Sequence, residues 1–289
     1  MKLSGTYTAL ITPFNNDGSV DYKALRDLVQ WQIAGGVEGL VPVGTTGESP
    51  TLDFDEHVKV IEATAEAAAG KVQIIAGTGA NSTSEALALT KAVLQSGVDA
   101  SLQVTPYYNR PNAEGLYRHF SSVADLGLPV VLYNVPGRAG REIPLDVVVR
   151  LSSHEKVAAV KEAAGSVDRV SAIRDACELP VLSGDDSLAL PMISVGACGV
   201  ISVASNVIPK EMSSMVRLAL DNDLSAAREM HRTCYPLFRD LFIDTNPVPV
   251  KTALAMMHRT GPVFRLPLCE PTYKVREQLA RTLSSFGLL

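Results

Sequence analysis

The sequence predicts an α/β protein in which eight strands alternate with helices and close into a (β/α)8 TIM barrel, with a C-terminal helical extension. Short apolar runs recur along the chain, and helical patterns with start and stop signals lie between most of them. The runs are nearly continuous in apolar character, as in parallel strands that are covered on both faces. An open doubly wound sheet is the alternative, because both folds are built from right-handed strand–helix–strand units.

The eight expected strands occupy residues 7–12, 39–44, 72–78, 101–105, 130–134, 157–161, 180–184 and 199–203. The helices between them are marked by start signals, namely Asp21, the cap pair Asp53 and Glu56, the capping box Ser82 and Glu85, and Pro144. Glycines follow several of the helical patterns and are expected to end them.

The chain continues well beyond the eighth strand, and this part reads as helical. A helix over 210–220 would complete the barrel, and further helices are expected over 223–240, 250–257 and 272–284. Prolines separate these patterns. We therefore expect a catalytic barrel over 1–222 and a C-terminal helical region over 223–289.

Composition narrows the classes of function. The 289 residues are 46% hydrophobic and carry 26 basic against 31 acidic side chains, which gives a net charge of −5. No basic block is present, so a nucleic-acid partner is not expected, and an anionic substrate would need a local basic group. Four dispersed cysteines, an N-terminus without an apolar leader and interrupted apolar runs predict a cytoplasmic protein with no membrane partner.

Catalytic groups of such a barrel stand at the C-terminal ends of its strands, and one lysine stands there. Lys161 ends the apolar run that starts at Val157, so it is expected to be partly removed from water, which favours the neutral amine. A neutral lysine amine can form a Schiff base with a carbonyl substrate. Alternatively, Lys161 extends out of the rim or pairs with Glu162.

Other strand ends carry groups that bind anions or move protons. The GTTGE run at 44–48 can hold a carboxylate on backbone N–H groups and hydroxyls, although the motif alone favours a tight strand-to-helix turn. Tyr108, Tyr133 and Thr45 can pass protons along a hydrogen-bonded chain, and Arg138, on an expected loop, can hold a carboxylate bidentately. Rim packing of the tyrosines and a solvated arginine are the alternatives. The five histidines show no metal-binding spacing, so no metal is expected.

Taken together, these motifs resemble the dihydrodipicolinate synthase family. The resemblance is collinear from the first strand through the C-terminal helices and therefore covers essentially the whole chain. It rests on GTTGE at 44–48, TPYYNRP at 105–111, YNVPGRAG at 133–140, VKEAAG at 160–165, SGDD at 183–186 and GVISV at 199–203.

The resemblance implies a pyruvate-dependent Schiff-base lyase that needs no metal or organic cofactor. Lys161 would attack the ketone of pyruvate, and the resulting enamine would add to L-aspartate 4-semialdehyde on the route to lysine through diaminopimelate. Thr45, Tyr133 and Tyr108 match the family's proton relay, with Tyr108 supplied by a neighbouring subunit. A homotetramer, arranged as a dimer of dimers, is implied as well.

The resemblance also assigns substrate contacts. The backbones of Thr45 and Thr46 match the site for the pyruvate carboxylate, and Arg138 matches the group that receives the carboxylate of the aldehyde substrate. Gly184 and Ile201 match backbone contacts around the pocket.

Some members of the family bind lysine as a feedback inhibitor in a cleft between two subunits. Phe54 stands where inhibited bacterial relatives often carry a histidine, and Pro50 also differs from some of them. The residues that match the inhibitor site are Ser49, His57, Asn81, Glu85 and Tyr107.

Two other functions remain open from the sequence. A related pyruvate lyase, such as N-acetylneuraminate lyase or a 2-keto-3-deoxy-sugar-acid aldolase, is the first. Those relatives usually lack an arginine at the position of Arg138, and sialate lyases tend to read GSTGE at 44–48, so both features favour the synthase. The second is a barrel kept as a binding module, against which Lys161 and the two relay tyrosines argue.

Overall fold

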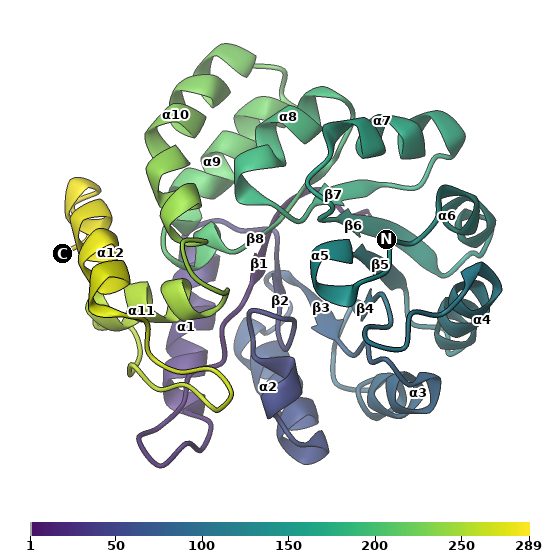
Figure 1. Cartoon of the computed structure of the whole chain (residues 1–289), viewed down its shortest axis with the longest axis horizontal. Coiled ribbons are helices and arrows are strands. Elements are labelled where there is room, and N and C mark those ends of the chain that lie inside the picture. The colour runs from purple at the N-terminus through teal and green to yellow at the C-terminus, as the bar shows by residue number, and fades with distance from the viewer. Residues whose placement is uncertain (1) are drawn as a thin grey trace.

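The structure, a computed structural model, describes residues 2–289 and has eight parallel strands that pair in chain order and close into one barrel. Helices surround the barrel (Figure 1). This confirms the predicted (β/α)8 fold and excludes the open doubly wound sheet, whose first and last strands would not pair. The strands are β1 Gly5–Ala9, β2 Gly39–Val41, β3 Gln73–Gly77, β4 Ala100–Val104, β5 Val130–Asn134, β6 Val157–Glu162, β7 Val181–Ser183 and β8 Gly199–Ser202.

The helices follow the predicted order, with boundaries that differ by a residue or two. Within residues 2–289, no helix combines the length and apolar character needed to cross a membrane. The helices are α1 Tyr22–Ala34, α2 Phe54–Ala68, α3 Thr83–Ala92, α4 Ala113–Ala124, α5 Pro136–Ala139, α6 Leu145–Ser152, α7 Val167–Ala176, α8 Ala189–Ser194, α9 Pro209–Leu220, α10 Leu224–Asp240, α11 Val248–Met256 and α12 Tyr273–Ser285.

Two of the three predicted side-chain caps form. The Asp21 carboxylate accepts backbone N–H bonds at the start of α1, and Asp53 accepts from the backbone of Glu56 at the start of α2. Ser82 occupies the cap position of α3, but its hydroxyl pairs with the Ser84 hydroxyl at 2.8 Å instead of a backbone N–H. The predicted capping box is therefore wrong, because a neighbouring hydroxyl competes for the serine.

The C-terminal helical region packs closely on the barrel. One hydrophobic core contains strand residues such as Ile201 together with Leu237 of α10, Leu254 of α11 and Leu283 of α12. In Figure 1, α10 lies beside α9, and α11 and α12 lie at the outer edge near α1. The region is thus a continuation of the barrel's core, and it can bring residues to the mouth of the barrel.

His119 on α4 supplies a prediction about stability and pH. Its side chain is buried, and burial lowers its pKa from 6.5 to about 4. Because the unfolded chain binds this proton more readily, the contribution of His119 to stability is full above pH 6.5 and is lost as the pH drops toward 4, by about 3 kcal/mol. We expect His119→Gln to lose less stability than the native chain between pH 7 and pH 4.5 in urea unfolding. Equal losses in both proteins would contradict the assignment.

Candidate active site

Two adjoining cavities, of about 220 and about 80 Å³, open at the C-terminal ends of the strands. They share Gly44, Thr45, Leu102, Tyr133, Val135 and Arg138 as lining residues. Four residues with polar or charged side chains line only the smaller cavity, namely Thr46, Lys161, Asp185 and Asn246. The position agrees with the rule that barrel enzymes place their chemistry at this face.

Lys161 lies in the wall of the smaller cavity, near the end of β6. Lys161 is only 7% exposed. Its Nζ lies 4.1 Å from the ring centroid of Tyr133, the residue paired with it on the neighbouring strand β5. The Glu162 carboxylate lies elsewhere and accepts both Asn134 Nδ2 bonds, at 3.0 and 2.9 Å, with Arg169 at 3.8 Å. Lys161 is therefore neither extended into solvent nor paired with Glu162, and its amine faces the cavity.

The side chain of Lys161 has room because Gly184 stands beside it. A Cβ atom at Gly184 would lie 2.5 Å from Cβ of Ala163 and 3.2 Å from Cε of Lys161. Any larger residue would therefore collide with Ala163 and crowd the side chain of Lys161. The next residue, Asp185, lines the same cavity, where burial raises the pKa of its carboxyl group and the charge of Lys161 opposes that rise.

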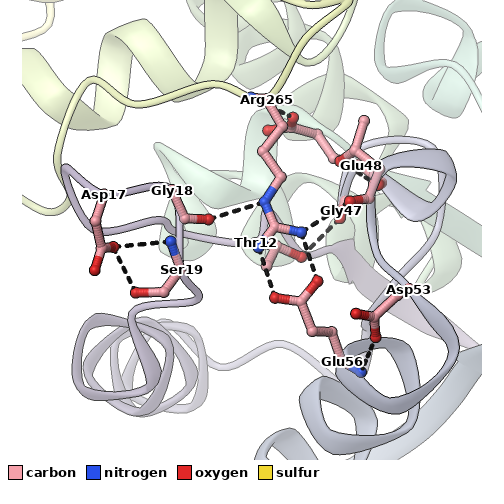
Figure 2. Close-up of polar contacts among 10 residues, drawn as sticks. Thr12, Asp17, Gly18, Ser19, Gly47, Glu48, Asp53, Glu56 and Arg265 are labelled. Carbon is pink, nitrogen blue, oxygen red and sulfur yellow. Dashed lines mark hydrogen bonds and ion pairs between the residues drawn. The ribbon is translucent and has the colours of Figure 1, made fainter.

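The loop over residues 44–48 presents backbone donors to the cavities. Within residues 2–289, the backbone N–H groups of Thr45 and Thr46 donate to no protein acceptor. The loop is tight, because the N–H of Gly47 donates to the carbonyl of Gly44 at 3.1 Å. The Thr12 hydroxyl donates to the Gly47 carbonyl at 2.7 Å, as Figure 2 shows. Two free N–H groups on a rigid turn form a site that suits a carboxylate.

Arg138 lines both cavities from the opposite side. The sequence placed it on a loop, and this is wrong: Arg138 belongs to the short helix α5, whose N–H groups at Ala139 and Gly140 bond back to Val135 and Pro136. Pro136 at the start favours this turn. The guanidinium donates from Nη2 to the Asn246 carbonyl at 3.1 Å, so Arg138 is held in place and keeps further donors for a ligand.

Asn246 and Phe242 reach the cavity from the C-terminal helical region, and sequence reasoning missed both. The Asn246 amide nitrogen donates to Thr46 Oγ1 at 3.0 Å, across 200 residues of chain. Asp185 was also missed as a lining residue, although it stands in the SGDD motif at a strand end. No local pattern marks Asn246, because only the packing of α10 and α11 on the barrel brings it to the site.

Two predicted site residues lie apart from these groups. Tyr108 is 92% exposed and lines neither cavity, so the single chain does not bring its phenol to Lys161. Ile201 is fully buried in β8, and Val203, two residues further on, lines the smaller cavity instead. The other predicted residues, Thr45, Thr46, Tyr133, Arg138, Lys161 and Gly184, all line it.

The residues matched to a feedback site gather along the larger cavity. Ser49 and Tyr107 line it, and the Asn81 amide donates to the Tyr107 carbonyl at 3.3 Å. Burial, reinforced by the charge of Glu85, raises the pKa of the Tyr107 phenol. His57 is buried, with Nε2 2.6 Å from the carbonyl of Gly77, another lining residue, and burial lowers its pKa.

Comparison with known proteins identifies the family. The family model for the dihydrodipicolinate synthetase family matches residues 2–286. A curated relative from Thermodesulfovibrio yellowstonii, "4-hydroxy-tetrahydrodipicolinate synthase", is 46% identical over 99% of this chain and 99% of its own length.

Solved structures agree with this match. The 4-hydroxy-tetrahydrodipicolinate synthase of Methylacidiphilum fumariolicum SolV has a TM-score of 0.97 at 52% identity, over 99% of this chain and 96% of that one. A dihydrodipicolinate synthase from Cyanidioschyzon merolae with lysine bound has a TM-score of 0.95 at 38% identity, over 99% of both chains. The chain therefore belongs to the dihydrodipicolinate synthetase family.

Proposed function

We propose that this chain is a 4-hydroxy-tetrahydrodipicolinate synthase, a lyase that condenses pyruvate with L-aspartate 4-semialdehyde in the diaminopimelate route of lysine biosynthesis. One observation carries the proposal: the buried amine of Lys161 faces a cavity between the free N–H groups of Thr45 and Thr46 and the guanidinium of Arg138. Such a cavity offers a nucleophile for a ketone and one anion site for each of two carboxylates. The relatives of this family carry the same activity in their names.

The covalent step uses Lys161. Its neutral amine attacks the keto carbon of pyruvate, the C–N bond forms, and the keto oxygen leaves as water after taking up two protons. Loss of a methyl proton converts the imine to an enamine. The nucleophilic carbon of the enamine then bonds to the aldehyde carbon of the second substrate, and cyclisation releases the product from the lysine.

Two anion sites orient the substrates. The N–H groups of Thr45 and Thr46 receive the pyruvate carboxylate, which places the keto carbon toward Lys161. Arg138 receives the carboxylate of the aldehyde substrate. The backbone of Gly184, which lines the smaller cavity, completes the contacts. A sugar-acid aldolase has less need of a charge at the position of Arg138, which favours the synthase over that second candidate.

Proton transfer completes the mechanism. Tyr133 and Thr45 line the same cavities and pass protons to and from the substrate oxygens. Tyr108, exposed in the single chain, acts in the site of a second copy, within a homotetramer arranged as a dimer of dimers. Ser49 and Tyr107 match the lysine site of feedback-inhibited relatives, whereas Phe54 and Pro50 differ from them. The enzyme works in the cytoplasm without a metal or organic cofactor.

Borohydride trapping tests the function. Reduction in the presence of pyruvate is expected to leave a stable adduct on Lys161, visible in the intact mass and by peptide mapping. A coupled assay with pyruvate and L-aspartate 4-semialdehyde should show turnover. An unmodified mass would favour a binding module. An adduct without turnover, alongside cleavage of a sugar acid, would favour the aldolase.

A further inference from the structure

The loop over residues 44–48, which is proposed to receive the pyruvate carboxylate, is held at its last residue by a buried ion pair. The last residue of the loop, Glu48, is 1% exposed and has a left-handed backbone with φ of 57°. Its Oε1 accepts from Nζ of Lys251 on α11, and both side chains are fully buried. The ammonium group of Lys251 also faces the rings of Phe14, at 4.2 Å, and Phe264, at 5.2 Å.

The other oxygen of Glu48 is held by an immobilised segment. Oε2 accepts from the backbone N–H of Arg265 at 3.4 Å. The guanidinium of Arg265 forms two 2.6 Å bonds with the Glu56 carboxylate and a 2.9 Å bond with the Gly18 carbonyl, as Figure 2 shows. A paired carboxylate with both oxygens bonded leaves Glu48 little freedom to rotate.

A second contact reaches the same loop two residues before α11. The side-chain nitrogen of Asn246 donates to Thr46 Oγ1 at 3.0 Å, and the backbone carbonyl of Asn246 accepts from Arg138 Nη2 at 3.1 Å. Residues 246–251 thus contact the loop at Thr46 and at Glu48, while also bonding to the arginine on the opposite side of the cavity. No contact of this kind is needed to close the barrel, whose strands pair among themselves.

We propose that Asn246 and Lys251 are positioning residues, which hold the loop over residues 44–48 so that its free N–H groups face the carboxylate of the keto acid. Neither residue takes part in the covalent steps. The inference rests on the proposed function and adds that the C-terminal helical region sets the affinity for the first substrate.

The buried ion pair carries a desolvation cost, which the attraction between two buried charges often does not offset. Burying two charges is expensive, and replacing such a pair with neutral groups of similar volume often leaves stability unchanged or improved. Burial lowers the pKa of Lys251, and the Glu48 carboxylate opposes this shift. The Glu48–Lys251 pair does, however, supply a directional contact. That contact holds Glu48, the last residue of the loop that carries the substrate's anion site.

The test replaces the pair with neutral groups of similar shape in Glu48→Gln/Lys251→Met. Unlike either single change, this variant leaves no unpaired buried charge, so it is expected to fold. We expect KM for pyruvate to rise about tenfold, as for the loss of one charged hydrogen bond, while KM for the aldehyde substrate changes less than twofold. Asn246→Ala, which disturbs no charge, should shift the same constant in the same direction.

The matched control is Asp240→Asn, which alters another buried carboxylate of the C-terminal region, bonded to Gln278 and Thr282 and without contact to the loop. It should leave both KM values unchanged. A purely structural role would reduce the amount of active enzyme and hence kcat, without a selective effect on pyruvate. Native KM values in the double variant, or in Asn246→Ala if the double variant does not fold, would overturn the inference. Absence of a pyruvate adduct on the native chain would instead overturn the proposed function.

Discussion

Lys161→Ala should abolish the borohydride-trapped pyruvate adduct and reduce turnover by several orders of magnitude. The reason is that no other amine lines the smaller cavity within residues 2–289, so covalent activation of pyruvate is lost. The measurement combines intact mass after reduction with the coupled rate assay. Because Lys161 packs on Tyr133 and beside Gly184, its truncation leaves space for water and should not prevent folding.

Two variants sharpen this prediction. Lys161→Arg keeps a positive charge but has no amine that forms an imine at neutral pH, so it should be as inactive as the alanine variant. Lys156→Ala makes the same truncation at the opposite end of β6, on a lysine whose nearest acidic oxygen is 3.9 Å away on Glu155, and should keep the native rate. Near-native turnover in Lys161→Ala would refute the assignment of the nucleophile.

Tyr108→Phe should slow turnover by about 10²–10⁴-fold while the pyruvate adduct still forms, since only a proton carrier is removed. The single chain alone gives no reason to expect this effect, because the Tyr108 side chain is 92% exposed there and lines neither cavity. Stopped-flow and steady-state rates would measure the effect. The matched control is Tyr235→Phe on α10, another exposed tyrosine at 47%, which should have the native rate.

Mixing the Lys161→Ala and Tyr108→Phe variants shows whether Tyr108 acts in the site of a second copy or in the site of its own chain. In a dimer of Lys161→Ala with Tyr108→Phe, one of the two sites combines an intact Lys161 with the partner's intact Tyr108. Co-expression should therefore recover about a quarter of the native activity for random pairing in a twofold-symmetric dimer. Recovery of none would place Tyr108 in the site of its own chain.

Much of the fold could be predicted because its signals are local. Apolar runs of five to seven residues and caps such as Asp21 and Asp53 depend on residues close in the chain, and the expected elements appear in order. Local reasoning failed where two local preferences compete. Ser82 bonds to Ser84 instead of capping its helix, and Pro136 converts the expected loop at Arg138 into a helical turn.

The sequence by itself determined that strands and helices alternate, that Lys161 ends a buried strand, and that GTTGE lies at the end of another strand, because each depends on residues close in the chain. Only the tertiary structure decided what faces these groups. Pairing of β5 with β6 aligns Tyr133 with Lys161, and packing of α11 brings Asn246 to Thr46 and Lys251 to Glu48. The two contacts made by Asn246 and Lys251 span about 200 residues, so they arise from the burial of a shared core and leave no local pattern.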